Sequence, residues 1–155
     1  MVIKDFTSGG IKLKTHMTQE QRDLLLKDLS MRLPYGIKVQ YENEIFDLEY
    51  VCPMYEEVKL DNHETWTLDI SEVKPYLFPL SSMTEEQWNN APRVNLTEFT
   101  FESLKCGCFT LASYTCENDL YDLVEFINWL LENHFDIYGL IPMGLANDAT
   151  DKGIY

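Results

Sequence analysis

The chain has 155 residues, and its 45% of hydrophobic and 25% of charged residues are ordinary for one globular domain that buries its own core. Its 26 acidic residues outnumber 12 basic ones. The resulting formal net charge of −14 argues against direct binding to nucleic acid or to anionic membranes. No run approaches the roughly 18 consecutive apolar residues of a membrane-spanning helix.

Residues 1–16 show little hydrophobic period, contain Ser8-Gly9-Gly10, and lack the continuous apolar core of a signal peptide. We therefore expect an N-terminal extension at 1–16 and a single domain at 17–155. The four cysteines are too few and too dispersed for a disulfide framework in a chain of this size. Together these features predict a cytoplasmic protein with reduced thiols.

A first helix is predicted from Thr18 to Arg32. Thr18 and Gln21 have the spacing of a capping box, in which two side chains satisfy free N–H groups at the start of a helix. Pro34 and Gly36 then end the helix, because proline lacks the N–H group that a helix interior needs. The expected apolar face consists of Leu24, Leu25, Leu29 and either Met31 or Leu33.

Alternation of apolar and polar residues predicts the strands that follow. The apolar positions of an antiparallel hairpin would be Ile37, Val39 and Tyr41, followed by Phe46, Leu48 and Tyr50. Those of a third and a fourth strand would be Val58 and Leu60, followed by Trp66, Leu68 and Ile70. Because acidic residues occupy many of the polar positions, we expect the exposed face of this sheet to be strongly acidic.

Prolines limit the next segment to short elements. Two prolines leave the secondary structure of residues 69–80 ambiguous and allow only a short helix there. Thr84 and Gln87 form a second capping box, so a short helix is predicted to begin at Thr84 and to end before Pro92.

Two further strands are predicted between residues 94 and 114, joined by a turn at 102–105. Their alternating apolar positions are Phe99 and Phe101, followed by Phe109 and Leu111. In this interpretation Cys106 and Cys108 point to the same face of the second strand.

The longest helical period runs from Asn118, the predicted N-cap, to His134. Residues at the i, i+3, i+4 and i+7 spacing form one stripe, Leu120, Leu123, Val124, Ile127, Leu130, Leu131 and His134. We expect this stripe to face the sheet. Ile127 would then be fully buried at its centre and Glu125 would lie on the side exposed to water.

The order of these elements predicts an α+β fold in a single domain. We expect an antiparallel sheet of about four to six strands, helices packed on one face of it, and a long C-terminal helix. After that helix, Gly139, Pro142 and Gly144 predict that the chain folds back as a turn or as a single short helix.

Three stretches of the chain, RLPYGIKV, VKPYLFPLSSMTEEQ and NHFDIYGLIPMGLA, carry a resemblance that extends over residues 33–39, 73–87 and 133–146. They resemble a family of small acidic proteins encoded by Bacteroides-type gut bacteria and by their phages or mobile elements. Residues 1–16 depart from this pattern, because members usually begin near the position of Met17. The resemblance implies no catalytic residues. It implies an accessory role in a phage or mobile element, where small acidic proteins often act by binding other proteins.

Cys106 and Cys108 are the candidates for a soft-metal site, because two thiolates on one face of a strand can begin one. A structural zinc site needs four ligands, and its familiar close pair is C-x2-C. Cys52, Cys116 and the three histidines do not stand at ligand spacing. Small buried thiols are the simpler interpretation, and we predict no metal and no cofactor.

Two other groups invite a chemical interpretation. His134 and Asp136 could form a proton-transfer pair, but a histidine that stabilises the carbonyl end of a helix explains the same residues more simply. A group of acidic residues could bind a divalent cation, yet it lacks the spacing of a calcium loop, and a solvated loop is the simpler interpretation. Its members are Glu56, Glu57, Asp61, His63 and Glu64.

The chain contains no glycine-rich phosphate loop and none of the common hydrolase, metalloprotease or dinucleotide-binding motifs. The first hypothesis is therefore a non-catalytic protein-binding module that uses an acidic sheet face against a basic, nucleic-acid-binding partner. The residues expected to bind are Glu42, Glu44, Asp47, Glu49, Glu56 and Glu57. The alternative is a small enzyme or metal-binding protein built on Cys106, Cys108 and His134.

Two explanations of the acidity stay open. It serves solubility, or it imitates nucleic acid, which requires the charge to be gathered on one face. Exposed aromatic residues could anchor a protein interface, and the candidates are Tyr35, Tyr55, Trp66 and Tyr138. The predicted partner is a protein, without direct contact to nucleic acid or membrane, and the oligomeric state is left open.

Overall fold

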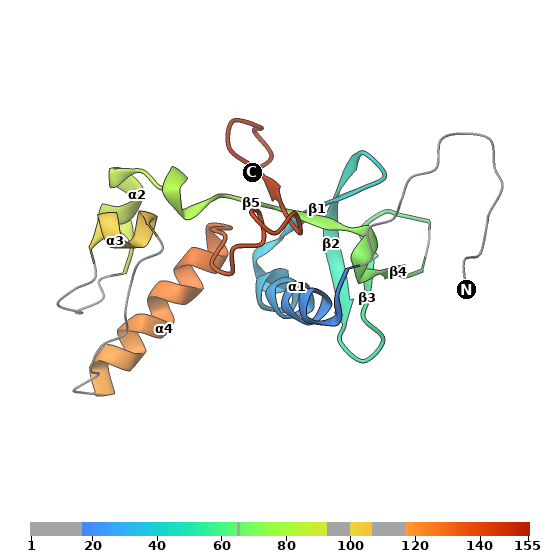
Figure 1. Ribbon diagram of the computed structural model, residues 1–155, viewed down its shortest axis with the longest axis horizontal. Helices are drawn as coiled ribbons and strands as arrows, with labels where there is room; N and C mark the ends of the chain where they lie inside the picture. The colour runs from blue at the N-terminus through green and yellow to red at the C-terminus, as the bar shows by residue number, and fades with distance from the viewer. Residues whose placement is uncertain (1–16, 65, 93–99, 107–116) are drawn as a thin grey trace.

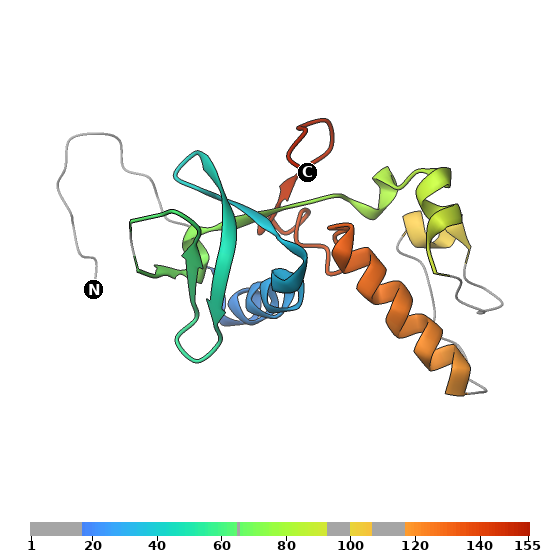
Figure 2. The same ribbon diagram turned by 180° about the vertical axis from the view of Figure 1, so that it is seen from behind.

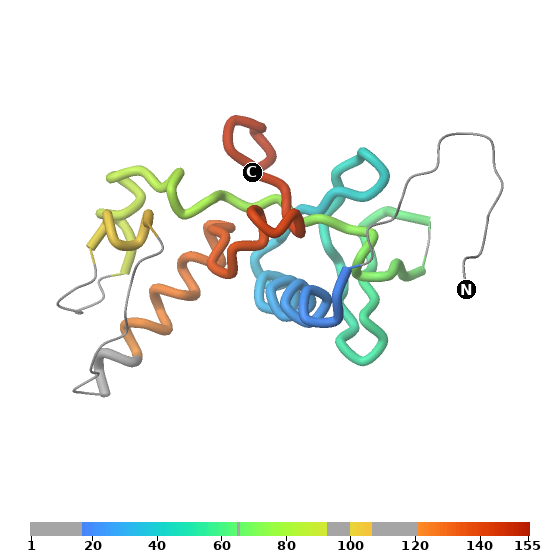
Figure 3. Tube along the Cα trace, viewed as in Figure 1, coloured from blue at the N-terminus to red at the C-terminus, as the bar shows by residue number. Residues whose placement is uncertain are grey.

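The computed structural model describes residues 17–64, 66–92, 100–106 and 117–155, and only the backbone of 117–120 (Figures 1 and 3). The expected extension at 1–16 lies outside this description. The helices of the described part are α1 (Gln19–Arg32), α2 (Glu85–Asn90), α3 (Phe101–Lys105) and α4 (Glu117–Glu132). Its strands are β1 (Lys38–Tyr41), β2 (Glu44–Cys52), β3 (Glu57–Leu60), β4 (Leu68–Asp69), β5 (Lys74–Leu77) and β6 (Asn147–Asp148). Short 3-10 helices occupy Leu33–Tyr35, Ile70–Glu72 and Leu80–Ser82.

The described strands form a six-stranded sheet in the order β4-β3-β2-β1-β5-β6. Neighbouring strands are antiparallel except β5 and β6, which pair in parallel through Tyr76 with Asn147 and Leu77 with Asp148. The predicted α+β class and strand number are confirmed. The sheet is mixed rather than antiparallel, because β6 returns to the sheet edge from a part of the chain that follows α4.

The hairpin predicted at the start of the sheet is present as β1 and β2, in a register that pairs Val39 with Phe46. Its turn residues Glu42 and Asn43 both have positive φ angles, as tight hairpin turns require. The third strand is also confirmed. The fourth is shorter than predicted, because Ile70 already belongs to a 3-10 helix.

The first hydrophobic core lies between α1 and one face of the sheet (Figure 2). The predicted capping box is present, since Thr18 Oγ1 accepts the N–H of Gln21 and Gln21 Oε1 accepts the N–H of Thr18. Leu25 and Leu29 of α1 are fully buried, and each such leucine contributes about 1.5–3 kcal/mol of transfer free energy. The sheet side of the core consists of Ile37, Val39, Leu48, Val51, Val58 and Leu60.

A second hydrophobic cluster joins α2, α3 and α4, which Figures 1 and 2 show on the opposite side of the molecule from β3 and β4. The rings of Trp88, Phe126, Trp129 and Phe135 run through it, with neighbouring centroids 5.9–6.1 Å apart. The flank of α4 that carries Phe126 and Leu130 is therefore the buried one. The prediction that Ile127 is fully buried against the sheet is wrong, because the aromatic flank turns it to a partly exposed position.

The predicted strand through Phe101 and the turn at 102–105 are also wrong, because these residues form α3. Thr100 Oγ1 accepts the N–H of Ser103 across 3.1 Å, and Ser103 Oγ accepts the N–H of Thr100 across 2.9 Å, which starts a helix there. Asn118 is not the N-cap, since α4 already begins at Glu117. The other predicted strand positions, Phe99, Phe109 and Leu111, lie outside the described residues.

The end of α4 is a Schellman motif. The N–H of Phe135 donates to the carbonyl of Leu130 across 2.9 Å, and that of His134 donates to Leu131 across 3.1 Å. His134 takes the left-handed conformation, φ 58°, that glycine usually adopts at this position. The segment 137–146 then folds back through a turn, one of the two predicted forms, and returns Leu140, Leu145 and Ala146 to the first core.

A buried ion pair lies where the first core meets α4. Arg32 Nε and Nη2 donate to the two carboxylate oxygens of Asp28 across 2.8 and 2.9 Å, and both side chains are fully buried. Arg32 also donates to the carbonyls of Leu131, across 3.4 Å, and Phe135, across 2.6 Å. Burial raises the pKa of Asp28, and the charge of Arg32 opposes that rise. Arg32 therefore supplies the positive charge at the carbonyl end of α4 that was predicted from His134.

Candidate functional site

The turn between β2 and β3, at residues 53–56, exposes a group of large side chains. Met54 is 81% exposed and Tyr55 is 69% exposed, and the preceding strand adds exposed Tyr50 and partly exposed Cys52. We call these four residues the hairpin tip. Single exposed apolar side chains are normal on protein surfaces, but here a methionine and two tyrosines are exposed within the six residues from Tyr50 to Tyr55.

The hairpin tip follows directly from the pairing of its two strands. Val51 pairs with Val58 and both point into the first core, while Cys52 pairs with Glu57 at the last position before the turn. Glu56 closes the turn in the left-handed conformation, φ 54°. Its carbonyl accepts the N–H of Ile70 across 2.9 Å, so the turn is also bonded to the neighbouring 3-10 helix.

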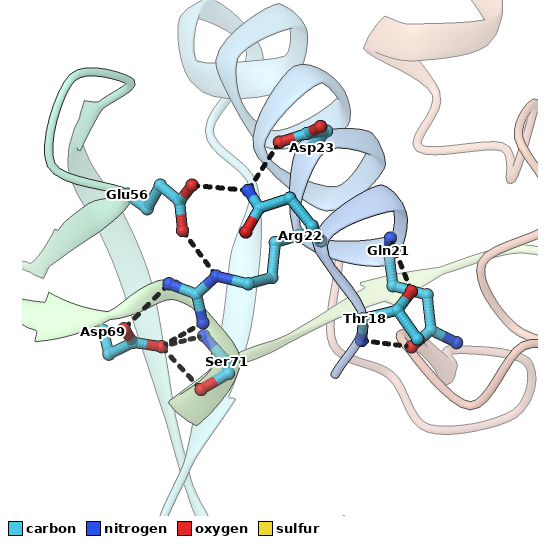
Figure 4. A network of polar contacts seen from close by, with 8 residues as sticks. Thr18, Gln21, Arg22, Asp23, Glu56, Asp69 and Ser71 are labelled. Carbon is cyan, nitrogen blue, oxygen red and sulfur yellow. Dashed lines mark hydrogen bonds and ion pairs between the residues drawn. The ribbon is translucent and has the colours of Figure 1, made fainter. Parts of the chain in front are cut away.

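An ion-pair network ties this turn to α1 (Figure 4). Arg22 of α1 donates through Nε to the carboxylate of Glu56, and Gln19 Nε2 donates to the same carboxylate across 2.7 Å. The two Nη atoms of Arg22 bind both carboxylate oxygens of Asp69, each across 2.8 Å. Such a bidentate fork fixes geometry more strictly than a single ion pair does. The turn is thereby held from α1 and from β4 at once.

The charges of this network shift the pKa values of its members. The hydrogen bonds from Arg22, followed by that from Gln19, lower the pKa of Glu56. The hydrogen bond from Arg22 likewise holds the pKa of Asp69 well below its usual range, and Asp69 raises the pKa of Arg22 further. All three groups therefore stay charged at neutral pH, and the tie is present under physiological conditions.

Cys52 has a distinct electrostatic environment at the hairpin tip. A hydrogen bond from the Tyr50 hydroxyl lowers the pKa of its thiol, and the backbone N–H groups of Tyr55 and Met54 act in the same direction. The same interaction raises the pKa of Tyr50. The hairpin tip therefore combines apolar side chains with polar groups that are already bonded to one another.

The six predicted acidic binding residues do not form one uniform face. Asp47 pairs with Lys38 and Glu49 pairs with Lys59, each across 2.7 Å, so the exposed face of the hairpin is mixed in charge. Glu56 turns towards Arg22 of α1. Glu49, Glu56 and Glu57 lie next to the hairpin tip, whereas Glu42 and Glu44 lie at the opposite end of β2.

The residues of the alternative, chemical site are placed in different parts of the fold. Cys106 caps the end of α3, Cys108 lies outside the described residues, and His134 follows the end of α4. Within the ranges that the structure describes, no three His, Cys, Asp or Glu side chains are arranged to hold a metal ion.

His134 and Asp136 do not form a proton-transfer pair. The carboxylate of Asp136 accepts the N–H groups of Leu140 and Ile141, across 2.8 and 2.9 Å. The imidazole of His134 is buried and stacks on the ring of Tyr155, with centroids 3.9 Å apart, and its Nδ1 atom has no hydrogen-bond partner among the residues that the structure describes. Burial, and then the charges of Arg32 and Lys38, lower the pKa of His134 to about 4. The imidazole is thus neutral and enclosed at neutral pH.

The side chains of the predicted cation-binding loop likewise make separate contacts with other residues. Glu56 belongs to the Arg22 network, and Asp61 accepts a hydrogen bond from Asn62 across 2.8 Å. His63 packs edge-on against the rings of Tyr41 and Phe46, with centroids 5.2 Å apart in each case. The histidine therefore serves packing at the sheet.

Of the four aromatic residues proposed as exposed anchors, Tyr55 and Trp66 are exposed, whereas Tyr35 and Tyr138 are partly buried. Tyr50 and Met54 were not singled out by sequence reasoning. The available signal was the run Pro53-Met54-Tyr55, which places two apolar residues in a segment between two strand patterns, where polar residues are the rule.

Comparison of the chain with models of protein families, with curated proteins and with solved structures gives no match. Among the described helices, none has both the length and the apolar character needed to cross a membrane.

Proposed function

We propose that the protein is a non-catalytic protein-binding module, an accessory protein of a phage or mobile element, and that it contacts its partner through the hairpin tip. The observation that carries this proposal is the exposure of Met54 and Tyr55 on a turn that the Arg22 network holds in place. Tyrosine and methionine are enriched in protein interfaces, where they bury a large apolar area. The accessory setting rests on the family resemblance of residues 33–39, 73–87 and 133–146.

A fixed turn is well suited to binding. A loop that becomes ordered only on association loses conformational entropy, at about 0.5–1.5 kcal/mol for each side chain that is immobilised. Arg22 and Gln19 already hold Glu56, and Ile70 already bonds its carbonyl. Less of the binding free energy is therefore spent on ordering the backbone that presents Met54 and Tyr55.

The charge around the hairpin tip favours a basic partner. The carboxylate of Glu57 lies beside it, as does that of Glu49, which is paired with Lys59, and Asp23 of α1 shares the side-chain amide of Gln19 with Glu56. The rings of Tyr50 and Tyr55 add a second attraction, since aromatic faces bind lysine and arginine side chains. A nucleic-acid-binding protein in the cytoplasm has this chemistry. Direct contact with nucleic acid itself is disfavoured by the net charge of −14.

The test compares capture by two variants of the full chain from a lysate of a Bacteroides-type host. The double variant Met54→Ser/Tyr55→Ser removes the apolar part of the hairpin tip. Trp66→Ser is the matched control, because Trp66 is also a large side chain, 87% exposed, but lies outside the tip. A protein recovered with the unaltered chain and with Trp66→Ser, but at least tenfold less with the double variant, would support the proposal. Equal recovery with the double variant contradicts it.

The role of the network is tested separately with Arg22→Gln. This change leaves the exposed side chains in place and removes the two ion pairs that hold the turn. We expect weaker binding of the captured partner in isothermal titration calorimetry, with a larger entropic penalty. Unchanged affinity and entropy would show that the fixed turn is not part of the binding mechanism.

A further inference from the structure

The side chain of Tyr155 lies in a gap between β1 and β5. The register of these two strands pairs Gln40 with Lys74. Two residues further along, the same register would bring Lys38 opposite Tyr76. The Tyr155 hydroxyl lies between these two residues instead, where it accepts the N–H of Lys38 across 3.1 Å and donates to the carbonyl of Tyr76 across 2.9 Å. Main-chain groups thus match both hydrogen-bonding functions of a phenol.

The ring of Tyr155 contacts two other rings. It stacks on the imidazole of His134, with an interplanar angle of 17°, and its centroid lies 5.9 Å from that of Phe78. His134 is 7% exposed, so the surface on which the ring stacks belongs to the folded interior. We call the groups around the ring the tyrosine slot. They are the rings of His134 and Phe78, the N–H of Lys38 and the carbonyl of Tyr76.

The tyrosine slot is shallow, which distinguishes two kinds of ligand. Tyr155 is 44% exposed while it occupies the slot. Pockets for small molecules, in contrast, bury about 70–90% of the surface of their ligand. A slot that leaves this much of its occupant in water suits a side chain that is held in place by its own backbone. The chemistry of the slot is therefore that of a protein tyrosine and not that of a free phenol.

A short exposed loop carries Tyr155 to the slot. The loop starts at Ala149, whose N–H donates to the carbonyl of Leu77 on β5 across 2.8 Å. The N–H of Lys152 then donates back to the carbonyl of Ala149 across 3.2 Å, and residues 151–153 are exposed. Figures 1 and 2 show this segment standing away from the sheet and returning to it at its end. The contacts of the Tyr155 side chain are those that return the loop to the sheet.

We propose that the tyrosine slot is a docking site for a tyrosine side chain of another protein, and that Tyr155 occupies it in cis until such a partner displaces it. The present occupant identifies the chemistry of the partner, because a phenylalanine would leave the N–H of Lys38 and the carbonyl of Tyr76 unpaired. A short linker holds its own ligand at an effective concentration that is roughly millimolar. A partner that adds contacts around the slot can overcome this competition. The inference does not depend on the hairpin tip, which lies on β2 and β3.

The probe is N-acetyltyrosinamide, compared with N-acetylphenylalaninamide, which lacks the hydroxyl. Binding to the full chain is followed by the NMR shift of the Lys38 amide. We expect weak binding to the unaltered chain and about tenfold tighter binding to Tyr155→Phe, because the competing side chain has lost its two hydrogen bonds. Binding to Tyr155→Ala should be tighter still, since no ring competes. Each of these chains should bind the tyrosine amide at least about tenfold more tightly than the phenylalanine amide.

Tyr55→Phe is the matched control, because it also removes a hydroxyl from a tyrosine, one that is 69% exposed at the hairpin tip. It should bind the probe as the unaltered chain does. Equal affinity of Tyr155→Phe and the unaltered chain would show that Tyr155 does not compete with the probe, and would overturn the proposal. Equal binding of the two amides, or a Lys38 amide that does not move while others do, would overturn it as well.

Two further measurements complete the test. Circular dichroism establishes whether Tyr155→Ala is folded, and a folded variant that does not bind N-acetyltyrosinamide contradicts the proposal. If that variant is unfolded, Tyr155→Phe decides, because it keeps the ring and changes only the hydroxyl. Sedimentation identifies the occupant. A dimer of the unaltered chain that Tyr155→Ala converts to a monomer would assign the slot to Tyr155 of a second copy and overturn the proposal of another protein.

Discussion

The guanidinium of Arg32 donates to the main-chain carbonyl of Phe135 across 2.6 Å, and this bond joins the last residue of α1 to the end of the Schellman motif of α4. The same guanidinium is paired with Asp28 and is fully buried. A single charged side chain thus connects the first core, built on the sheet, to the second cluster, built on α2, α3 and α4. We therefore expect the loss of this side chain to destabilise both the first core and the second cluster.

Removing this charge is the first test. Arg32→Met leaves the carboxylate of Asp28 buried without a partner and frees the carbonyls of Leu131 and Phe135, so the free energy of unfolding should fall by about 3–5 kcal/mol. Urea denaturation followed by circular dichroism measures the change. The double variant Asp28→Leu/Arg32→Met removes both charges and should recover a large part of the loss. A double variant that is no more stable than Arg32→Met would show that the carbonyl bonds, not the ion pair, carry the effect.

The second prediction concerns acid. His134 has a pKa of about 4 in the folded chain against 6.5 as its ordinary value, so the unfolded chain binds the proton more tightly. The free energy of unfolding is therefore highest above pH 6.5 and falls as the pH drops from 6.5 towards 4, by up to about 3 kcal/mol. Denaturation midpoints measured across this range test it. His134→Asn is the comparison, because asparagine accepts the left-handed conformation and does not titrate, and its profile should be flatter over the same interval.

The third prediction concerns the seam between β1 and β5. The hydroxyl of Tyr155 accepts the N–H of Lys38 across 3.1 Å and donates to the carbonyl of Tyr76 across 2.9 Å, so it bridges the two strands. The residue as a whole is 44% exposed, yet burial raises the pKa of its hydroxyl to about 12. Tyr155→Phe leaves both backbone groups unpaired and should cost about 1–3 kcal/mol.

Hydrogen exchange locates that effect, because the amide of Lys38 should exchange faster in Tyr155→Phe. Tyr55→Phe is the control, since it removes a hydroxyl from an exposed ring and should stay within about 0.5 kcal/mol. Equal costs for the two variants would contradict a bridging role for Tyr155.

The orientation of α4 gives the fourth prediction. Phe126 is buried among the aromatic rings of the second cluster, and Phe126→Ala should cost about 3–5 kcal/mol by leaving a cavity. Ile127→Ala should cost less, near 1 kcal/mol, because that side chain is partly exposed already. Glu125→Ala should change stability by less than about 0.5 kcal/mol. Thermal denaturation of the three variants checks the order, and an Ile127→Ala cost equal to that of Phe126→Ala would place the helix the other way round.

Local signals predicted the elements that depend on neighbouring residues. The capping boxes at Thr18 and Thr84 and the alternation from Ile37 to Leu60 each identify an element from a short window, and the structure confirms them. The same kind of signal at Thr100 was missed because serine, rather than glutamate or glutamine, completes the box.

Features that depend on distant partners could not be predicted. The stripe of α4 was expected to face the sheet. Instead Phe126, on the aromatic flank of α4, packs against Trp88 of α2, which in turn packs against Phe101 of α3. Asp28 and Arg32 stand at i, i+4 spacing, which on a helix ordinarily means an exposed pair. Asp28 and Arg32 are buried because the end of α4 packs over them. The sequence of α1 alone gives no information on where α4 lies.

In the candidate site too, local features were predicted and contacts between distant residues were not. The strands on either side of the hairpin tip were predicted, and so was the exposure of Tyr55. The tie from Arg22 to Glu56 and Asp69 was not, because it joins residues far apart in the sequence. Sequence reasoning gave weight to the number of carboxylates, whereas the structure shows that Asp47, Glu49 and Glu56 are already paired with bases.

The pairing of β5 with β6 can form only late in synthesis, because the two strands are far apart in the sequence. β5 ends at Leu77, and among the described strands its outer edge pairs only with β6, whose residues Asn147 and Asp148 leave the ribosome much later. At 5–20 residues per second this interval lasts roughly 4–14 s. During that time the nascent chain exposes an unpaired strand edge, which is a template for association with other chains. Pro75, which lacks an N–H group, lies in that strand and weakens the template while the rest of the protein is being made.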